Sequence, residues 1–401
     1  MAERGQFRRE WDYDVLIVGG SLVGLTLAAW LGQRSLRVLV IEAQEGLAGQ
    51  PARVYALMPL TQQIWDCVGL WSAVAPWVQP YYQIDLSDQG CHAVVFTPAD
   101  LGGKQALGYV GEHRTLWPVC WAQVTRMPTV QYWAGARLTA MSVTAGGAQV
   151  QVQRREECQA LTVGLVVGAD GADSQVRQQA GIGTWGWPYR QSCLTAVVRA
   201  EQAPIAYERF WPTGPLALLP LPEQRWGLVW TLPHAQAAAL AQAPVATFLA
   251  QLAPYLPFAG VTLVGQRRCF PVRWRQARRY VQPRVALVGD AAHGCHPVGG
   301  QGLNLGLRDA ATLGEVVATA YERGEDIGSL RVLHRYERWR WFQVLLVLVF
   351  TDSLNRLFSQ GGWLVVRLRA WLLQTMQRVG LLRRVSLGFM AGLWGKRPAH
   401  L

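Results

Sequence analysis

The first forty residues restrict the fold more than any other part of the chain. The apolar run Asp14-Val15-Leu16-Ile17-Val18 enters the turn Gly19-Gly20-Ser21-Leu22-Val23-Gly24, a helical pattern continues to Leu31, and a second apolar run ends at Glu42. This strand, glycine turn, helix and strand predict a β-α-β unit of the dinucleotide-binding kind. The glycines let a pyrophosphate approach a helix N-terminus, and Glu42 can accept hydrogen bonds from an adenosine ribose.

Two later segments also combine a buried strand with an acid and glycines. In the first, VVGADGADSQVR (residues 166–177), a strand ends at Asp170 and Gly171 and Ser174 begins a helix. An ordinary turn with Asp170 as a helix cap would give the same local pattern.

The second of these segments, RVALVGDAAHGCHPVGGQGLNLGLRDA (residues 284–310), is the more specific. Its strand delivers Asp290 to a point where a carboxylate can hold a sugar-alcohol hydroxyl. A loop with few side chains, from Pro297 to Gly302, then leads into a helix whose N-terminal amides can polarise an electron-accepting ring.

The pattern of predicted strands and helices in the remaining chain suggests three parts. Alternating strands broken by Pro and Gly occupy about 76–104 and 185–268, and they predict one antiparallel sheet inserted into the nucleotide domain. The nucleotide domain is then expected at 1–75, 105–184 and 269–330. After residue 330 the pattern is helical, so 331–401 is expected to be a basic, amphipathic helical segment.

Composition and charge indicate the partners. Hydrophobic residues make up 51% of the 401 residues and charged residues 16%, which excludes a disordered chain. The net charge is +12, and residues 331–401 carry twelve Lys or Arg against two acids. Because these arginines alternate with Trp, Leu, Val and Phe, we expect an anionic membrane surface as the partner rather than a nucleic acid.

The seven cysteines are scattered and form no C-x-x-C, so neither a disulfide framework nor a metal site is expected. The N-terminus is charged where a signal peptide would be apolar. The longest apolar run near the end, Val344 to Phe350, is shorter than a membrane span. These features predict a cytoplasmic protein that lies on a membrane without crossing it.

Together, the three segments GGSLVG, GADGADSQVR and GDAAHGCHPVGGQGLNLGLRDA resemble the FAD-dependent aromatic hydroxylases. The stretches ARVYAL (52–57), LGYVGEHRTL (107–116), ERFWPTGPLALLPL (208–221) and TDSLNRLFS (351–359) look like the hydroxylases of ubiquinone and plastoquinone biosynthesis, which act on polyprenylated phenols. The resemblance implies an α/β fold, in which a Rossmann-like FAD domain of the para-hydroxybenzoate hydroxylase type carries an inserted antiparallel-sheet substrate domain and a C-terminal helical segment.

The resemblance also implies the FAD-binding residues. Gly19, Ser21, Gly24 and Glu42 would hold the adenosine-diphosphate half, and Arg53 and Arg114 would contact FAD between pyrophosphate and ring. Asp170 and Gly171 would belong to a signature shared by FAD and nicotinamide, and Asp290 would hold the ribityl chain. The isoalloxazine would have as neighbours Pro297, Gly300, Gly302 and Asn304. Ser21 departs from a glycine usual in the family, and His113 stands where the family often has Asn.

Other candidates have structural alternatives. Pro297 and His296 are the only catalytic candidates in the flavin loop, and a structural role is favoured for both His293 and His296. Cys295 is interpreted as packing. Aromatic and apolar side chains on the inserted strands are either core or substrate pocket, and those assigned to the pocket are Phe210, Leu218 and Trp230, with Trp211 and Trp226 as further aromatics.

The implied reaction is hydroxylation of a prenylated phenol by O2. Reduced FAD would form a C4a-hydroperoxide whose distal oxygen is attacked by the phenol ring. Electrons would come from NAD(P)H or an external reductase, and no residue is assigned as the base. Two alternatives remain open, namely a flavin-dependent prenyl-chain reductase of the geranylgeranyl type and a non-catalytic flavoprotein scaffold of a quinone-biosynthesis assembly.

Overall fold

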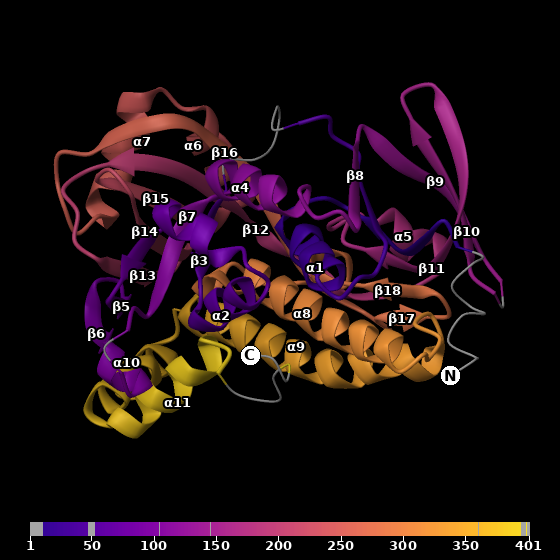
Figure 1. The fold of residues 1–401 in the computed structure, drawn as a ribbon. Coiled ribbons are helices and arrows are strands. Elements are labelled where there is room, and N and C mark those ends of the chain that lie inside the picture. The colour runs from indigo at the N-terminus through magenta and orange to yellow at the C-terminus, as the bar shows by residue number, and fades with distance from the viewer. Residues whose placement is uncertain are drawn as a thin grey trace.

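A computed structural model describes residues 11–46, 53–103, 105–144, 146–359, 361–393 and 398. Two large sheets dominate it. Helices α8 (Gln301–Glu322) and α9 (Leu330–Ser359) run side by side beneath one of them, the nucleotide-binding sheet, in the view of Figure 1. The chain is a mixed α/β protein, as expected.

The first sheet is the nucleotide-binding sheet. Its strands lie in the order β17-β18-β11-β1-β2-β8, with β10 and β9 extending from β11. Strands β18, β11, β1, β2 and β8 run parallel. Their bounds are β1 Tyr13–Val18, β2 Val38–Glu42, β8 Val130–Ala134, β9 Ala136–Val143, β10 Ala148–Arg154, β11 Glu157–Gly168, β17 Val281–Gln282 and β18 Val285–Leu287.

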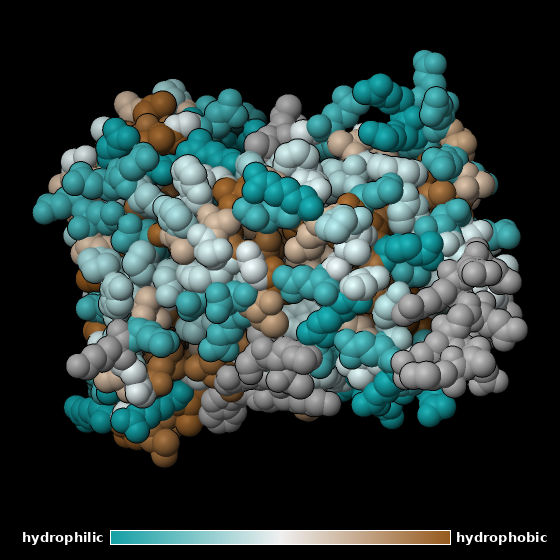
Figure 2. Space-filling view, viewed as in Figure 1, coloured by the Kyte–Doolittle hydropathy of each residue, from teal (hydrophilic) through white to brown (hydrophobic). Residues whose placement is uncertain are grey.

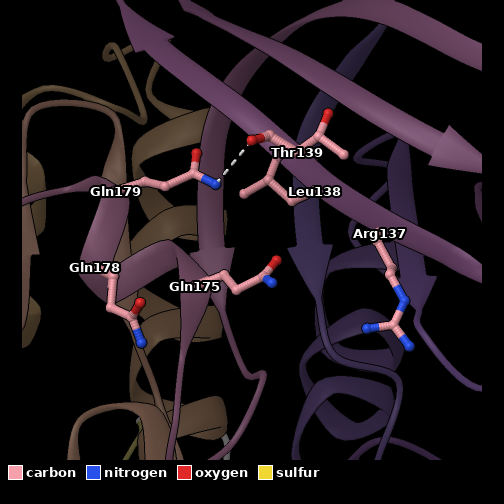
Figure 3. Close-up of a pocket in the computed structure, with 6 residues that line it drawn as sticks. All are labelled: Arg137, Leu138, Thr139, Gln175, Gln178 and Gln179. Carbon is pink, nitrogen blue, oxygen red and sulfur yellow. Dashed lines mark hydrogen bonds between the residues drawn. The ribbon is translucent and has the colours of Figure 1, made fainter.

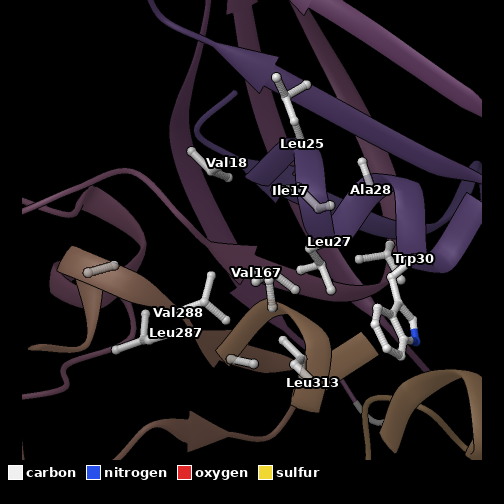
Figure 4. Close-up of a cluster of buried hydrophobic side chains, with 14 of the residues drawn as sticks. Ile17, Val18, Leu25, Leu27, Ala28, Trp30, Val167, Leu287, Val288 and Leu313 are labelled. Carbon is white, nitrogen blue, oxygen red and sulfur yellow. The ribbon is translucent and has the colours of Figure 1, made fainter. Parts of the chain in front are cut away.

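Helices pack on this sheet and on each other, and α1 (Leu22–Gly32) lies against both α4 (His113–Val124) and α8 (Gln301–Glu322). Figure 4 shows the resulting core, in which the Trp30 indole reaches from α1 towards α8. Trp30 is 2% exposed, and a Cβ on Gly314 of α8 would come within 2.6 Å of the indole. This contact requires glycine at 314 and fixes α1 against α8, with the glycine turn between β1 and α1 held above them.

The second sheet is mainly antiparallel, in the order β19-β16-β12-β15-β14-β13-β5-β6, and only β13 and β5 pair in parallel. Its strands are β5 Gln83–Asp88, β6 Cys91–Phe96, β12 Thr184–Arg199, β13 Ile205–Trp211, β14 Gly214–Leu221, β15 Arg225–Pro233, β16 Thr262–Ala277 and β19 His293–Gly294. The predicted boundary at 268 therefore falls inside β16, which continues into the nucleotide-binding half of the molecule.

One face of the second sheet is covered by α6 (His234–Gln242) and α7 (Val245–Leu252). The other face turns towards a small third sheet, β3 (Val54–Leu57), β7 (Gly108–Glu112) and β4 (Gln79–Tyr81), and towards the C-terminal helices. Short elements complete these connections: α2 Pro59–Cys67, α3 Trp71–Val74, α5 Gln175–Gln179, and the 3-10 turns η2 Ala75–Trp77, η3 Pro98–Leu101, η4 Ala253–Tyr255, η5 Gly289–Ala291 and η6 Val298–Gly300.

The C-terminal segment is helical, as expected, but its first helix is not an appendage. Helix α9 (Leu330–Ser359) packs along α8, and its inner residues Leu333, Val344 and Leu348 are fully buried in the main core. Helices α10 (Trp363–Arg378) and α11 (Gly380–Met390) lie farther from this core, at the lower left of Figure 1.

We expected no helix able to cross a membrane. By length and apolar composition alone, α9 would suffice, and it is the one such helix among the described residues. Its buried inner face shows that it also serves as a core helix of the folded chain.

Candidate flavin-binding site

The glycine turn after β1 can accept only glycine at two positions. Gly19 has φ +108°, and a Cβ there would lie 2.3 Å from the carbonyl oxygen of Ala169. A Cβ on Gly24 would lie 2.0 Å from the carbonyl oxygen of Gly19. The Gly20 amide donates to Glu42 Oε2 at 2.8 Å, so the acid at the end of β2 braces the turn. Ser21 is the N-cap residue of α1, and its side chain makes no capping hydrogen bond.

The second segment lies directly beside this turn, because the Ala169 amide donates to the Val18 carbonyl at 2.7 Å. Asp170 does cap a helix: its Oδ2 accepts the amides of Gln175 and Val176 at 2.7 and 3.2 Å. Its Oδ1 is buried and has no hydrogen-bond partner in the described part of the chain. Asp170 therefore has both the structural role and an oxygen left over for a ligand.

Arginine side chains join the third segment to the second. Arg177 donates to the carbonyls of Ala291 and Ala172 at 2.8 and 3.0 Å, and Arg275 donates to the Asp290 carbonyl at 2.7 Å. Asp290 itself is exposed beyond the buried end of β18. The three segments thus converge at the carboxyl ends of the neighbouring strands β1, β11 and β18, where ligands of open α/β sheets bind.

The flavin loop, which we define as residues 297–302, connects β19 to α8. Gly299 and Gly300 have φ +66° and +60°, a left-handed conformation that favours glycine, and Gly300 is the N-cap residue of α8. Pro297 and Gly302 are partly exposed along the loop. The amide of Asn304 is fully occupied by protein, since it accepts from the Met58 amide and the Thr61 hydroxyl and donates to the carbonyls of Ala56 and Gly300. Asn304 therefore positions the loop.

The two arginines predicted to contact FAD differ in their partners. The side chain of Arg53 is solvent-accessible, and burial alone would lower its pKa, but Tyr55 and Asp290 raise the pKa above its usual value. This interaction places Arg53 close to the third segment. Arg114 is 58% exposed in its side chain and pairs with Glu112 at 3.0 Å. Beside Arg53, burial and the Arg53 charge lower the pKa of His113 to about 4, so His113 is neutral.

Both histidines of the third segment are buried. His293 Nε2 lies 2.5 Å from Asp309 Oδ2, and Arg340 Nε lies 2.7 Å from Asp309 Oδ1, all fully buried. Burial alone would raise the pKa of Asp309, but His293 and Arg340 outweigh it and lower that pKa. Burial lowers the pKa of His296 to about 3 and raises that of Cys295 to about 12. The structural interpretation thus fits His293, and Cys295 remains a neutral thiol.

The second sheet separates the three predicted pocket residues. Phe210 points towards the flavin-loop side, where it stacks on Phe358 of α9 with ring centroids 3.9 Å apart. Leu218 and Trp230 lie in the core on the opposite face, under α6 and α7, as does Trp226. Of the three, only Phe210 can approach a substrate bound at the flavin loop.

Sequence reasoning missed Glu208, whose carboxyl group lies near enough to the backbone amide of Gly299 in the flavin loop for that amide to lower its pKa. Burial raises the pKa of Glu208 to about 7, although its side chain keeps partial access to solvent. Glu208 is the only acid between Ile205 and Leu221, a segment of strand-forming apolar residues. That isolation was the available signal.

A separate depression of about 370 Å³ lies between β9 and α5. Figure 3 shows that half of its lining residues are glutamines, of which Gln179 donates to the Thr139 carbonyl at 3.3 Å. None of the predicted site residues lines it, and it holds no acid or base apart from Arg137. Within the described residues no cluster of His, Cys, Asp or Glu could hold a metal ion.

The residues present fit FAD. Two glycines at which a Cβ would collide with backbone open the turn before α1, Asp170 keeps one buried oxygen without a partner, and Asp290 is exposed at the adjacent strand end. A dinucleotide laid across these three strand ends would reach the flavin loop, which lies at the N-terminus of α8.

Comparison with known proteins agrees with this assignment. The FAD binding domain family matches residues 12–341. Ubiquinone hydroxylase UbiL of Rhodospirillum rubrum is 37% identical, covering 97% of this chain and 92% of that protein. The 3-demethoxyubiquinol 3-hydroxylase of Escherichia coli is 34% identical, covering 95% and 98%. The crystal structure of p-nitrophenol 4-monooxygenase PnpA from Pseudomonas putida shares the fold, with a TM-score of 0.84 over 97% of this chain and 100% of that chain at 21% identity. The chain therefore belongs to the FAD-dependent aromatic hydroxylases, a family of monooxygenases, and lies close to the hydroxylases of ubiquinone biosynthesis.

Proposed function

We propose that the protein hydroxylates the aromatic ring of a prenylated phenol in quinone biosynthesis, of the ubiquinone or plastoquinone type. The observation that carries the proposal is a buried apolar cluster at the flavin loop, together with two relatives named ubiquinone hydroxylase and 3-demethoxyubiquinol 3-hydroxylase. Val298 of the loop, Phe210 of β13 and Phe358 of α9 are each at most 5% exposed and belong to one cluster. Apolar surroundings of this kind suit an aromatic ring with a hydrocarbon tail.

FAD, when bound and reduced, supplies the oxygen atom that it takes from O2. The chain holds the cofactor through the three strand ends, orients the phenol between the flavin loop and β13, and excludes water through the apolar cluster. The electrons come from NAD(P)H that binds transiently or from an external reductase. In support, the described residues contain one glycine-turn β-α-β unit, β1-α1-β2, which FAD would occupy.

The decisive experiment measures O2 consumption and product mass with 2-farnesylphenol. A hydroxylase adds one oxygen atom to the phenol ring, whereas a prenyl-chain reductase adds hydrogen and a scaffold leaves the phenol unchanged. Neither of these alternatives is supported by the names of the relatives. Turnover of a short benzoate with no hydroxylation of the prenylated phenol would refute the proposal.

We further propose that α10 and α11 rest on the anionic cytoplasmic membrane surface, where a prenylated substrate resides, and where a quinone-biosynthesis assembly would meet the protein. Figure 2 shows hydrophobic residues gathered over these helices at the lower left. The most exposed are Trp363 at 66%, Leu364 at 64%, Trp371 at 60% and Leu381 at 68%. No acid follows Asp352 in the sequence, so α10 and α11 supply no carboxylate of their own. Arg369 and Arg383 pair with Asp88 and Asp100 of other elements, which leaves Arg367, Arg378 and Arg384 to face an anionic surface. Lys396 and Arg397, which we counted with this basic segment, lie outside the described residues.

Vesicle flotation tests this membrane contact. Full-length protein should float with anionic vesicles at low salt, and the variant Trp371→Ser/Leu381→Ser should lose most of that binding. The matched control is Val245→Ser, because Val245 is also exposed, at 49%, but lies at the start of α7. A truncation near residue 330 is unsuitable, since it would remove the buried face of α9. Equal flotation of the double variant and the wild type would contradict the proposal.

A further inference from the structure

Glu208 lies on the face of the second sheet that is turned towards the flavin loop. Side chains alternate along β13, so Ala206, Glu208 and Phe210 share one face, and Tyr207 and Arg209 share the other. Ala206 and Phe210 belong to the same cluster as Val298 of the flavin loop, which confirms the direction of this face. The Gly299 amide lies close enough to the Glu208 carboxyl group to lower its pKa, so Glu208 lies beside the loop itself.

Among the residues that the structure describes, Glu208 forms no ion pair. On the neighbouring strand β5, Asp88 pairs with Arg369 at 2.9 Å, and Asp85 lies with Tyr207 and Arg209 on the opposite face. On α9, which also packs against β13, Asp352 pairs with Arg356 at 2.8 Å.

Two opposing effects set the pKa of Glu208. Burial raises its pKa to about 7, and the Gly299 amide works in the opposite direction. A carboxyl with this pKa takes up and releases protons at neutral pH, which is the condition for effective general base catalysis. His296 and His113 lack this property, because burial lowers their pKa values to about 3 and about 4.

Resting on the proposed function, we propose that the Glu208 carboxylate is the base that accepts the phenolic proton of the substrate. The O–H bond of the phenol breaks, its electron pair stays on the oxygen, and the proton bonds to a carboxylate oxygen of Glu208. The phenolate so formed pushes electron density into the ring, which makes the ring carbon a stronger nucleophile. Glu208 returns the proton to the same oxygen as the ring carbon loses its hydrogen to water and the product becomes aromatic again.

The kinetic test compares the wild type with Glu208→Gln, using 2-farnesylphenol and a ring-difluorinated 2-farnesylphenol whose hydroxyl is more acidic. With 2-farnesylphenol, wild-type hydroxylation should rise with pH through about 7, whereas the variant should be 10²- to 10⁴-fold slower, the usual range for a lost general base. With the acidic phenol the ratio of wild-type to variant rates should shrink at least tenfold, because that phenol ionises without help. Taking the ratio cancels the lower nucleophilicity of the fluorinated ring.

Asp85→Asn is the matched control, because it removes a carboxylate from the adjacent strand on the opposite face of the sheet. It should keep the wild-type pH profile. If Glu208→Gln slows both phenols by the same factor, or keeps the rise through pH 7, Glu208 is not the base. If the wild type hydroxylates no prenylated phenol, the proposed function fails first, and the following measurement still tests the carboxyl group.

Infrared difference spectra of the FAD-bound enzyme follow Glu208 without turnover. The C=O band of a protonated carboxyl should be present at pH 6 and disappear with a midpoint near pH 7 in the wild type. The band should be missing in Glu208→Gln and unchanged in Asp85→Asn. A wild type without a titrating band near pH 7 would overturn the assignment.

Discussion

Replacing Glu208 by glutamine should stabilise the folded protein at alkaline pH although it impairs the reaction. Burial raises the pKa of Glu208 from 4.5 in the unfolded chain to about 7 in the folded chain. The folded state therefore binds the proton more tightly, and the stability that the neutral carboxyl contributes is complete below pH 4.5 and is lost as the pH rises through 7. Glutamine keeps an oxygen for the Gly299 amide and never ionises.

The magnitude follows from the size of the shift. A rise from 4.5 to about 7 corresponds to about 3 kcal/mol at pH values well above 7. Because Glu208 keeps partial access to solvent, screening reduces this to about 2 kcal/mol between pH 5 and pH 8. The advantage of the variant over the wild type should therefore grow by about 2 kcal/mol across this interval.

Urea unfolding of both proteins at pH 5 and pH 8, at fixed FAD concentration, measures the difference. Asp85→Asn again serves as the control, since its carboxyl lies on the opposite face of the sheet. A difference between Glu208→Gln and the wild type that stays constant with pH would show that the carboxyl titrates at its ordinary pKa. That result would remove the electrostatic basis of the proposed base.

Three further substitutions test the flavin site and its supports. Asp290→Ala should weaken FAD binding about 10- to 100-fold, as expected for a lost charge-assisted hydrogen bond, and a flavin fluorescence titration with unchanged affinity would reject the ribityl assignment. Gly24→Ala should give folded, colourless protein, because its Cβ would lie 2.0 Å from the Gly19 carbonyl; a yellow preparation with the full flavin complement would contradict this. Arg369→Ala should cost about 3–5 kcal/mol in urea unfolding by leaving Asp88 buried without its ion pair, and Arg369→Met/Asp88→Leu should recover most of that; equal losses in both would contradict it.

The flavin-binding half of the fold was predictable because its signals are local. Gly19, Gly24 and Glu42 lie within one β-α-β unit. The two glycines stand where the backbone leaves no room for a Cβ, and Glu42 accepts a backbone amide of the turn. Spacing along the chain therefore predicts their relation in space. The meeting of the three segments also follows from the pattern, since parallel strands place their carboxyl ends at one edge of a sheet.

Long-range pairing could not be predicted in the same way. Arg369 interrupts the apolar pattern of α10, yet it is 2% exposed and pairs with Asp88, which is far away in the sequence. Leu218 and Trp230 are of residue types that often line pockets. Only the pairing of β13, β14 and β15 shows that they face α6 and α7. Glu208 needed the same information, because its chemistry depends on which face of β13 meets the flavin loop.

The end of α11 contacts the flavin loop directly. Gln301, fully buried at the start of α8, donates both to the Gly299 carbonyl and to the Met390 carbonyl at the end of α11, each at 3.1 Å. A Cβ on Gly299 would lie 2.3 Å from the Met390 methyl group, so α11 occupies the space beside the loop. Since the Glu208 carboxyl group lies near the amide of the same Gly299, a displacement of α11 would shift the loop against the carboxylate. The proposed membrane contact and the proposed base are therefore connected through a single glycine, and the exposed apolar residues of α10 and α11 bear on the geometry of the flavin loop as well as on where the protein resides.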